Sequence, residues 1–202
     1  MPQRSGAEGL LTLMRQFARE AARSELADVP FLFWGWSAAG GFGPSFARLH
    51  PERTVAFIRY HSHLRGLSLD MQTAREIPAL LFVGGQDDPT FAEDATTMFN
   101  QGRGVNAPWA IVMREGVPHQ IRAADMEAAS RLTMPWVLAV VNRRLGNGAR
   151  LQALEIAEGW LGDDTTGRIV RVPDAEPSQE HRSWLPDEKT AAAWQSLVAP
   201  AK

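Results

Sequence analysis

The chain has 202 residues, 45% of them hydrophobic and 22% charged, with a formal net charge of −2. This composition is typical of an ordinary globular protein with enough residues for a sizeable core, and no basic block suggests nucleic acid or a membrane surface as a partner. The absence of cysteine excludes disulfides, thiolate nucleophiles and thiolate metal sites. No apolar run reaches the roughly 18 residues of a membrane span, and no signal peptide is predicted, so the default expectation is a cytoplasmic location.

The first elements are predicted by apolar spacing. Hydrophobic residues recur at helical spacing over 10–21, which predicts a helix. A short apolar run, Phe31–Trp34, then predicts a buried strand. A second helix is expected to begin just after Ser37 and to end near His50.

Strands and helices alternate along the next hundred residues. Strands are predicted from Thr54, in the run LLFVGG that ends at Gly85, and over Trp109–Met113. Helices are predicted over Ala95–Gln101 and over about 124–145. This alternation predicts an α/β domain with a mostly parallel sheet.

From Gly146 onward the sequence loses its periodicity and becomes rich in Pro, Asp and Ser. A disordered segment of this polarity would rarely carry three tryptophans, here Trp160, Trp184 and Trp194. We therefore expect an ordered, extended C-terminal tail, 146–202, that packs on a core formed by 1–145. A short closing helix is predicted from about Asp187.

The strand at Phe31 stops at a serine set among small residues, in GWSAAGG. A strand, a sharp turn with an exposed serine and then a helix form the local structure of a nucleophile elbow. Its strained backbone requires small residues two positions before and after the serine, and Gly35 and Ala39 occupy those positions around Ser37. The helix that follows points its N-terminus at the reaction centre, so the N–H of Ala38 can stabilise an oxyanion.

A serine hydroxyl needs a general base, and the base needs an acid that orients it. In parallel sheets, functional groups gather in the loops after the carboxyl ends of strands. Two such loops carry candidates: Asp87 and Asp88 follow LLFVGG, and His119 follows WAIVMREGVP. Serine, acid and histidine thus come in the chain order known for a triad that follows an elbow of this kind.

These motifs carry a family resemblance. The stretches Gly35-Trp36-Ser37-Ala38-Ala39-Gly40, Gly84-Gly85-Gln86-Asp87-Asp88 and Gly116-Val117-Pro118-His119 resemble those of an esterase-type α/β-hydrolase, over roughly residues 5–145. The chain is similar to the dienelactone-hydrolase and polyhydroxybutyrate-depolymerase-like branches. The resemblance implies Ser37 as nucleophile and His119 as general base. Asp87 and Asp88 both fit the acid, because each lies three residues after a glycine.

The chain departs from the family pattern in three ways. Ala39 replaces the usual second elbow glycine, and Gly41, Gly43 and Pro44 weaken the helix after the nucleophile. The strands that precede the nucleophile strand in the family have no counterpart, so the chain is expected to be N-terminally truncated relative to the family. That absence removes the usual second oxyanion donor and leaves the edge of the Phe31 strand exposed.

The resemblance implies hydrolysis of a carboxylic ester, in a small molecule or a polymer, through an acyl-enzyme and without a cofactor. A peptide or thioester would use the same groups. Trp36, beside the serine, is expected either to bind substrate or to pack in the core. The competing hypothesis is a catalytically impaired remnant that serves as an interaction module and self-associates as a homo-oligomer through its exposed strand edge.

A metal site is considered at His61 and His63, since residues two apart on a strand face the same way. The neighbouring sequence supplies no third ligand. No metal is therefore predicted.

Overall fold

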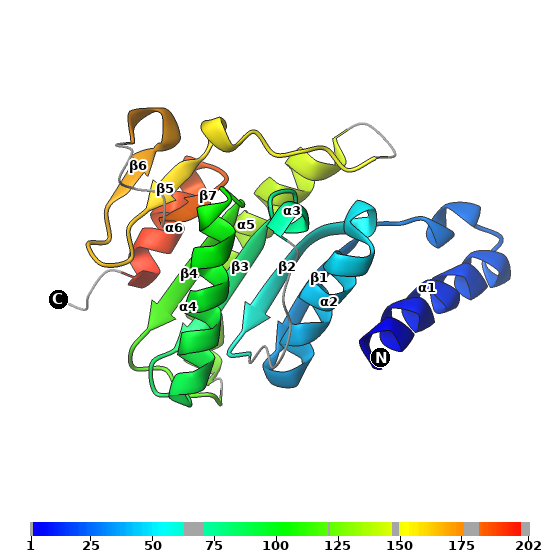
Figure 1. Ribbon diagram of the computed structural model, residues 1–202, viewed down its shortest axis with the longest axis horizontal. Coiled ribbons are helices and arrows are strands. Elements are labelled where there is room, and N and C mark those ends of the chain that lie inside the picture. The colour runs from blue at the N-terminus through cyan, green and yellow to red at the C-terminus, as the bar shows by residue number, and fades with distance from the viewer. Residues whose placement is uncertain (1, 63–70, 121, 147–149, 176–181, 199–202) are drawn as a thin grey trace.

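The computed structural model describes residues 2–62, 71–120, 122–146, 150–175 and 182–198 (Figure 1). Its centre is a four-stranded sheet in the order β1-β2-β3-β4, with all neighbouring strands parallel. The strands are β1 (Phe31–Trp36), β2 (Thr54–Tyr60), β3 (Ala79–Gly84) and β4 (Trp109–Arg114). The predicted α/β class with a mostly parallel sheet is confirmed.

Helices cover both faces of the sheet, as Figure 1 shows. The elements are α1 (Pro2–Glu20), α2 (Phe42–Leu49), α3 (Met71–Ala74), α4 (Pro89–Gly104), α5 (Ala123–Leu145) and α6 (Glu188–Val198). Helices α2 and α4 lie on one face and α5 on the other. Because strand side chains alternate between faces, each strand contributes to two separate hydrophobic layers.

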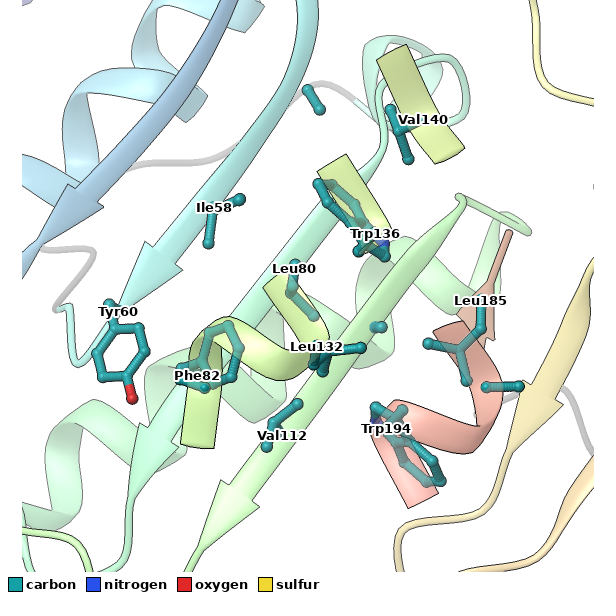
Figure 2. Close-up of a cluster of buried hydrophobic side chains, with 14 of the residues drawn as sticks. Ile58, Tyr60, Leu80, Phe82, Val112, Leu132, Trp136, Val140, Leu185 and Trp194 are labelled. Atoms are coloured by element: carbon teal, nitrogen blue, oxygen red, sulfur yellow. The ribbon is translucent and has the colours of Figure 1, made fainter. Parts of the chain in front are cut away.

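The layer under α5 is the one drawn in Figure 2. Leu132, Trp136 and Val140 project from α5 onto the sheet. They meet strand side chains that share one face, among them Ile58, Leu80 and Val112. Trp136 has no exposed surface. This layer fixes the relative positions of β2, β3 and β4, and therefore of the loops that follow them.

The C-terminal segment packs along the outer edge of β4. It forms a three-stranded antiparallel sheet, β6-β5-β7, from β5 (Trp160–Gly162), β6 (Ile169–Arg171) and β7 (Ser183–Leu185). Ser183 Oγ accepts a hydrogen bond from the N–H of Ile111 (2.9 Å), and the indole N–H of Trp194 donates to the carbonyl of Ile111 (2.8 Å). The backbone N–H and carbonyl of Ile111 are thereby satisfied on the outer side of β4.

The sequence predicted part of this arrangement. The closing helix α6 is present, and Trp184 and Trp194 are fully buried while Trp160 is partly buried. The three short strands were not predicted, because three residues are too few to show a two-residue period.

At the other edge, β1 pairs with β2 and with no further strand in the described ranges. Helix α1 packs on α2 through Ala7, Leu11 and Phe46, with Phe31 and Phe33 of β1 against the same cluster. The indole of Trp34 is left 45% exposed. No helix in the described part of the chain is long and apolar enough to cross a membrane.

Candidate active site

Ser37 lies directly after β1, at a sharp turn. Its φ is +53°, in the left-handed region that residues other than glycine rarely adopt. A Cβ at Gly35 would lie 2.3 Å from the carbonyl oxygen of Ala39, and one at Gly40 would lie 2.4 Å from Cβ of Ser62. Glycine is therefore required at both positions for the turn to close. Ala39, two residues after the serine, is exposed and is accommodated.

The two candidate acids follow β3 and have different contacts. Asp87 Oδ2 lies 2.8 Å from Nδ1 of His119. Asp88 instead caps α4, where its Oδ1 accepts hydrogen bonds from the N–H of Thr90 (2.9 Å) and from its hydroxyl (2.8 Å). The structure thus places Asp87, and not Asp88, against the histidine.

The loops after β3 and β4 approach each other closely, and glycines permit the approach. A Cβ at Gly84 would lie 2.3 Å from the carbonyl oxygen of Val117, and one at Gly85 would lie 2.6 Å from Cα of Glu115. Any larger residue would push the two loops apart. The acid and the histidine are held within hydrogen-bonding distance by this contact.

His119 connects the other two groups. Its Nε2 lies 3.0 Å from Oγ of Ser37, on the side of the ring opposite the Asp87 contact. The side chain of Asp87 is 3% exposed and that of His119 is 33% exposed. An ionised carboxylate can only accept, so Nδ1 carries the proton and Nε2 is free to accept one from the serine hydroxyl.

Two aromatic residues contact His119, one at its ring and one at its backbone carbonyl. Phe91 stacks on His119 with ring centroids 5.2 Å apart and planes 21° apart. The indole N–H of Trp36 donates to the carbonyl of His119 at 3.3 Å. Trp36 is 46% exposed, so the candidate substrate-binding residue lies at the surface beside the histidine, outside the core. Phe91 was missed, since nothing in its local sequence marks it.

The helix expected just after Ser37 begins as a 3-10 turn, Ser37–Gly41, before α2 starts at Phe42. Pro44 falls in the first turn of α2, where a missing N–H costs no helical hydrogen bond. Ala38, the candidate oxyanion donor, is the second residue of the 3-10 turn and is exposed. The first N–H groups of such a turn have no acceptor within it and can serve a ligand.

Few known proteins match this chain. No protein-family model matches the sequence, and no curated protein matches it. Among solved structures, the esterase PE8 aligns with a TM-score of 0.46 and 16% identity, over 66% of this chain and 63% of that one. The chain therefore spans less than two thirds of that esterase. So distant a likeness assigns no activity, and the dienelactone-hydrolase and depolymerase-like branches stay a prediction.

His61 also reaches this site, and its place there was not predicted. It follows β2, is 1% exposed and has a φ of +47°. Its Nδ1 lies 3.7 Å from Oδ2 of Asp87, and its ring stacks on Tyr60 with centroids 4.7 Å apart. Burial lowers the pKa of His61, so it is neutral near pH 7. A histidine just after a buried strand was the available signal. His63 lies outside the described residues.

The three groups His61, Asp87 and His119 are close enough to share a metal ion. Their candidate ligand atoms all lie within 4.8 Å of one another. The sequence near His61 offers no third ligand, but the loops after β3 and β4 bring Asp87 and His119 beside it.

A separate hollow of about 1090 Å³ lies at the amino ends of the strands, where Pro30 and Arg53 precede β1 and β2. Acidic and basic residues are mixed along its lining. The guanidinium of Arg144, on its wall, already donates to the carbonyls of Thr54, Glu76 and Gln152. Arg144 on this wall therefore has a structural role, since it links three backbone segments. The hollow lies at the opposite end of the sheet from Ser37.

Proposed function

We propose that the chain is a serine hydrolase that cleaves a carboxylic ester through an acyl-enzyme intermediate. The observation that carries this proposal is the pair of contacts at His119: Nε2 at 3.0 Å from Ser37 Oγ and Nδ1 at 2.8 Å from Asp87 Oδ2. A nucleophile, a base within hydrogen-bonding distance and an acid that orients the base are the parts that acyl transfer needs.

In the first half-reaction Ser37 Oγ attacks the ester carbonyl carbon, and its proton passes to Nε2 of His119. Asp87 accepts the hydrogen bond from Nδ1–H and stabilises the imidazolium that forms. When the tetrahedral intermediate collapses, the bond to the leaving alkoxide breaks, and His119 returns its proton to that oxygen. An alcohol leaves and the acyl group stays on Ser37.

In the second half-reaction His119 takes a proton from water, and the resulting hydroxide attacks the acyl carbon. Collapse releases the carboxylic acid, and Ser37 recovers its proton. The N–H of Ala38 is assigned to the oxyanion in both halves, in line with its position at the start of the 3-10 turn. Trp36 is assigned to the substrate side of the site, since it is exposed and contacts the histidine loop.

A second candidate function rests on the exposed edge of β1. This strand carries Trp34 and Trp36, exposed by 45% and 46%, and has no outer neighbour in the described ranges. An unpaired strand edge with apolar side chains is a template for another strand. Self-association through β1 is therefore the alternative role, and it requires no reactive serine.

A fluorophosphonate probe tests the first proposal. It needs an activated serine but a single turnover, so it does not depend on knowing the substrate. We expect stoichiometric labelling of the wild type and of Ser196→Ala, a control at an exposed helix position, and none of Ser37→Ala. Labelling of His119→Ala should be close to background. Failure of the folded wild type to react would overturn the proposal and favour the interaction role.

A further inference from the structure

We propose that His61, Asp87 and His119 form an inhibitory site for Zn²⁺, which regulates the catalytic site of the proposed hydrolase and so rests on that function. The three residues come from the ends of β2, β3 and β4, and their ligand atoms lie within 4.8 Å of one another. Two imidazoles and one carboxylate are a common ligand set for zinc.

The spacing of the atoms fits such a site. Zn–N and Zn–O bonds of about 2.0–2.2 Å place tetrahedral ligand atoms about 3.4 Å apart. The separation of Asp87 Oδ2 from Nδ1 of His119 is 2.8 Å, and from Nδ1 of His61 it is 3.7 Å. These two values bracket the required spacing. The remaining separation, between the two imidazole nitrogens, is at most 4.8 Å, so the rings would shift toward a common centre to hold one ion.

One ring nitrogen of His61 is placed to bind a metal ion. Its Nδ1 is buried, lies 3.7 Å from Oδ2 of Asp87 and has no hydrogen-bond partner in the described part of the chain. Most buried polar atoms have a partner, and a metal ion would supply one here.

The nearest group to this nitrogen is the carboxylate of Asp87, and both side chains are buried, with exposed fractions of 1% and 3%. At 3.7 Å no hydrogen bond joins the two atoms. A cation between them could bind to both. His119, 33% exposed, is the member through which an ion can enter from solvent.

The two imidazole ligands favour Zn²⁺ over Mg²⁺ and Ca²⁺. Mg²⁺ and Ca²⁺ prefer sets made of oxygen ligands only, whereas imidazole suits Zn²⁺ and its first-row neighbours. Zinc also tolerates three protein ligands with a fourth position left to water.

Metal binding at Nδ1 would stop the proposed chemistry through the tautomer of His119. The ion takes the lone pair of Nδ1, so the proton formerly on Nδ1 must sit on Nε2 instead. A protonated Nε2 cannot accept the hydroxyl proton of Ser37. At the same time Asp87 is withdrawn from its hydrogen bond to the ring.

Direct Zn²⁺ binding is the first test, and it does not depend on activity. Metal-free protein is titrated with Zn²⁺ by calorimetry, with Ser37→Ala alongside the wild type. We expect one ion per chain and equal affinity in both, because Ser37 is not a ligand. Absence of binding to the folded wild type would overturn the proposal.

Substitutions at the proposed ligands then test where the ion binds. His61→Asn and Asp87→Asn are expected to weaken Zn²⁺ binding by at least about 10- to 100-fold, since even residues that only orient ligands have effects of that size. The matched controls are His50→Asn, a partly buried histidine beside Glu8 and Glu52, and His63→Asn. Binding unchanged in His61→Asn, or lost in either control, would overturn this ligand set.

A spectroscopic measurement covers the case in which a variant fails to fold. Co²⁺ replaces Zn²⁺ in wild-type protein, and intense visible bands are expected from a four-coordinate nitrogen and oxygen set. The weak bands of a six-coordinate ion would contradict the proposal. In the wild type, Zn²⁺ should slow fluorophosphonate labelling in proportion to occupancy. Unreactive metal-free protein that still binds Zn²⁺ at these residues would overturn the hydrolase proposal and leave the metal site standing.

Discussion

The two edges of the central sheet differ in how they are covered. Along β4 the C-terminal segment satisfies the backbone of Ile111 through Ser183 and Trp194, and Trp194 has no exposed surface. Along β1 no strand pairs on the outer side within the described ranges, and Trp34 is 45% exposed. One edge is closed by the chain itself and the other is open.

Most of the exposed large apolar side chains lie near the open edge, and two lie on α5. The large exposed hydrophobic residues belong to α1, β1, the start of α2, and α5, and none of those identified belongs to β3, β4 or the C-terminal segment; they are Leu13, Phe17, Trp34, Trp36, Phe42, Met134 and Leu138.

The candidate site contains residues from strands at both edges of the sheet. Ser37 ends the open strand β1, whereas His119 follows the closed strand β4 and Asp87 follows its inner neighbour β3. The acid and the base therefore stand on the well-supported side. The nucleophile stands on the side where a partner could act.

The largest effect is expected at the acid, on the supported side. Asp87→Asn should lower the rate of acylation by about 10,000-fold, the size of loss seen when a triad acid becomes an amide and the histidine takes the wrong tautomer. Asp88→Asn is the matched control, because asparagine also caps a helix well and should keep the bonds to Thr90. Initial rates of probe labelling measure both. Equal losses in the two variants would contradict the assignment.

Contacts at the closed edge should contribute more to the free energy of unfolding than contacts at the open edge. Alanine substitution of one tryptophan at each edge compares the two. Trp194→Ala is expected to lower the free energy of unfolding by about 3–5 kcal/mol, since it removes a fully buried side chain and its bond to Ile111. Trp34→Ala should cost less than about 1 kcal/mol, because the ring is half in solvent. Urea unfolding followed by circular dichroism measures both. Similar losses would break the distinction between the edges.

Much of the site could be predicted because its signals are local. A buried strand, a serine between small residues and polar groups after strand ends are all visible over a few residues, and Ser37, Asp87 and His119 do come together. The choice between Asp87 and Asp88 needed the fold. Even so, an aspartate directly before Pro89 and Thr90 is a helix N-cap signal, which already points away from Asp88 as a partner of the histidine.

The rest depends on contacts between distant segments. The position of His61 beside Asp87 depends on the register of β2 against β3 and on a backbone conformation with φ of +47°, neither of which sequence spacing shows. The cover over β4 comes from Ser183 and Trp194, which lie 72 and 83 positions from Ile111 along the chain. Ser183 belongs to a strand too short to show a period.

We expect a charged substitution on the open edge of β1 to change association and to have little effect on the free energy of unfolding. If β1 pairs with a second copy, Trp34→Lys should shift the protein from dimer to monomer, because a charge on an edge strand opposes pairing. The free energy of unfolding of the monomer should change by less than about 1 kcal/mol. Sedimentation at several protein concentrations measures the shift, with Met134→Lys on α5 as a control at another exposed apolar position. A wild type that stays monomeric throughout would leave the edge without this role.

The smallest expected effect is on the pH dependence of the free energy of unfolding. It arises from His61, which follows β2 between the two edges. Burial lowers the pKa of His61 below its ordinary value of 6.5. As pH falls below about 6.5, the unfolded chain binds a proton at this residue that the folded chain does not, so the free energy of unfolding decreases. The decrease should stop once pH is below the lowered pKa, where both states are protonated.

His61→Asn should remove this component and flatten the stability profile between about pH 5 and 8, while His50→Asn should leave it. Urea unfolding in metal-free buffer at a series of pH values measures the slopes. The comparison is between slopes, because asparagine also changes packing at a buried position and shifts the whole curve. Parallel curves for wild type and His61→Asn would mean that His61 binds its proton equally well in both states. That result would contradict the lowered pKa of His61.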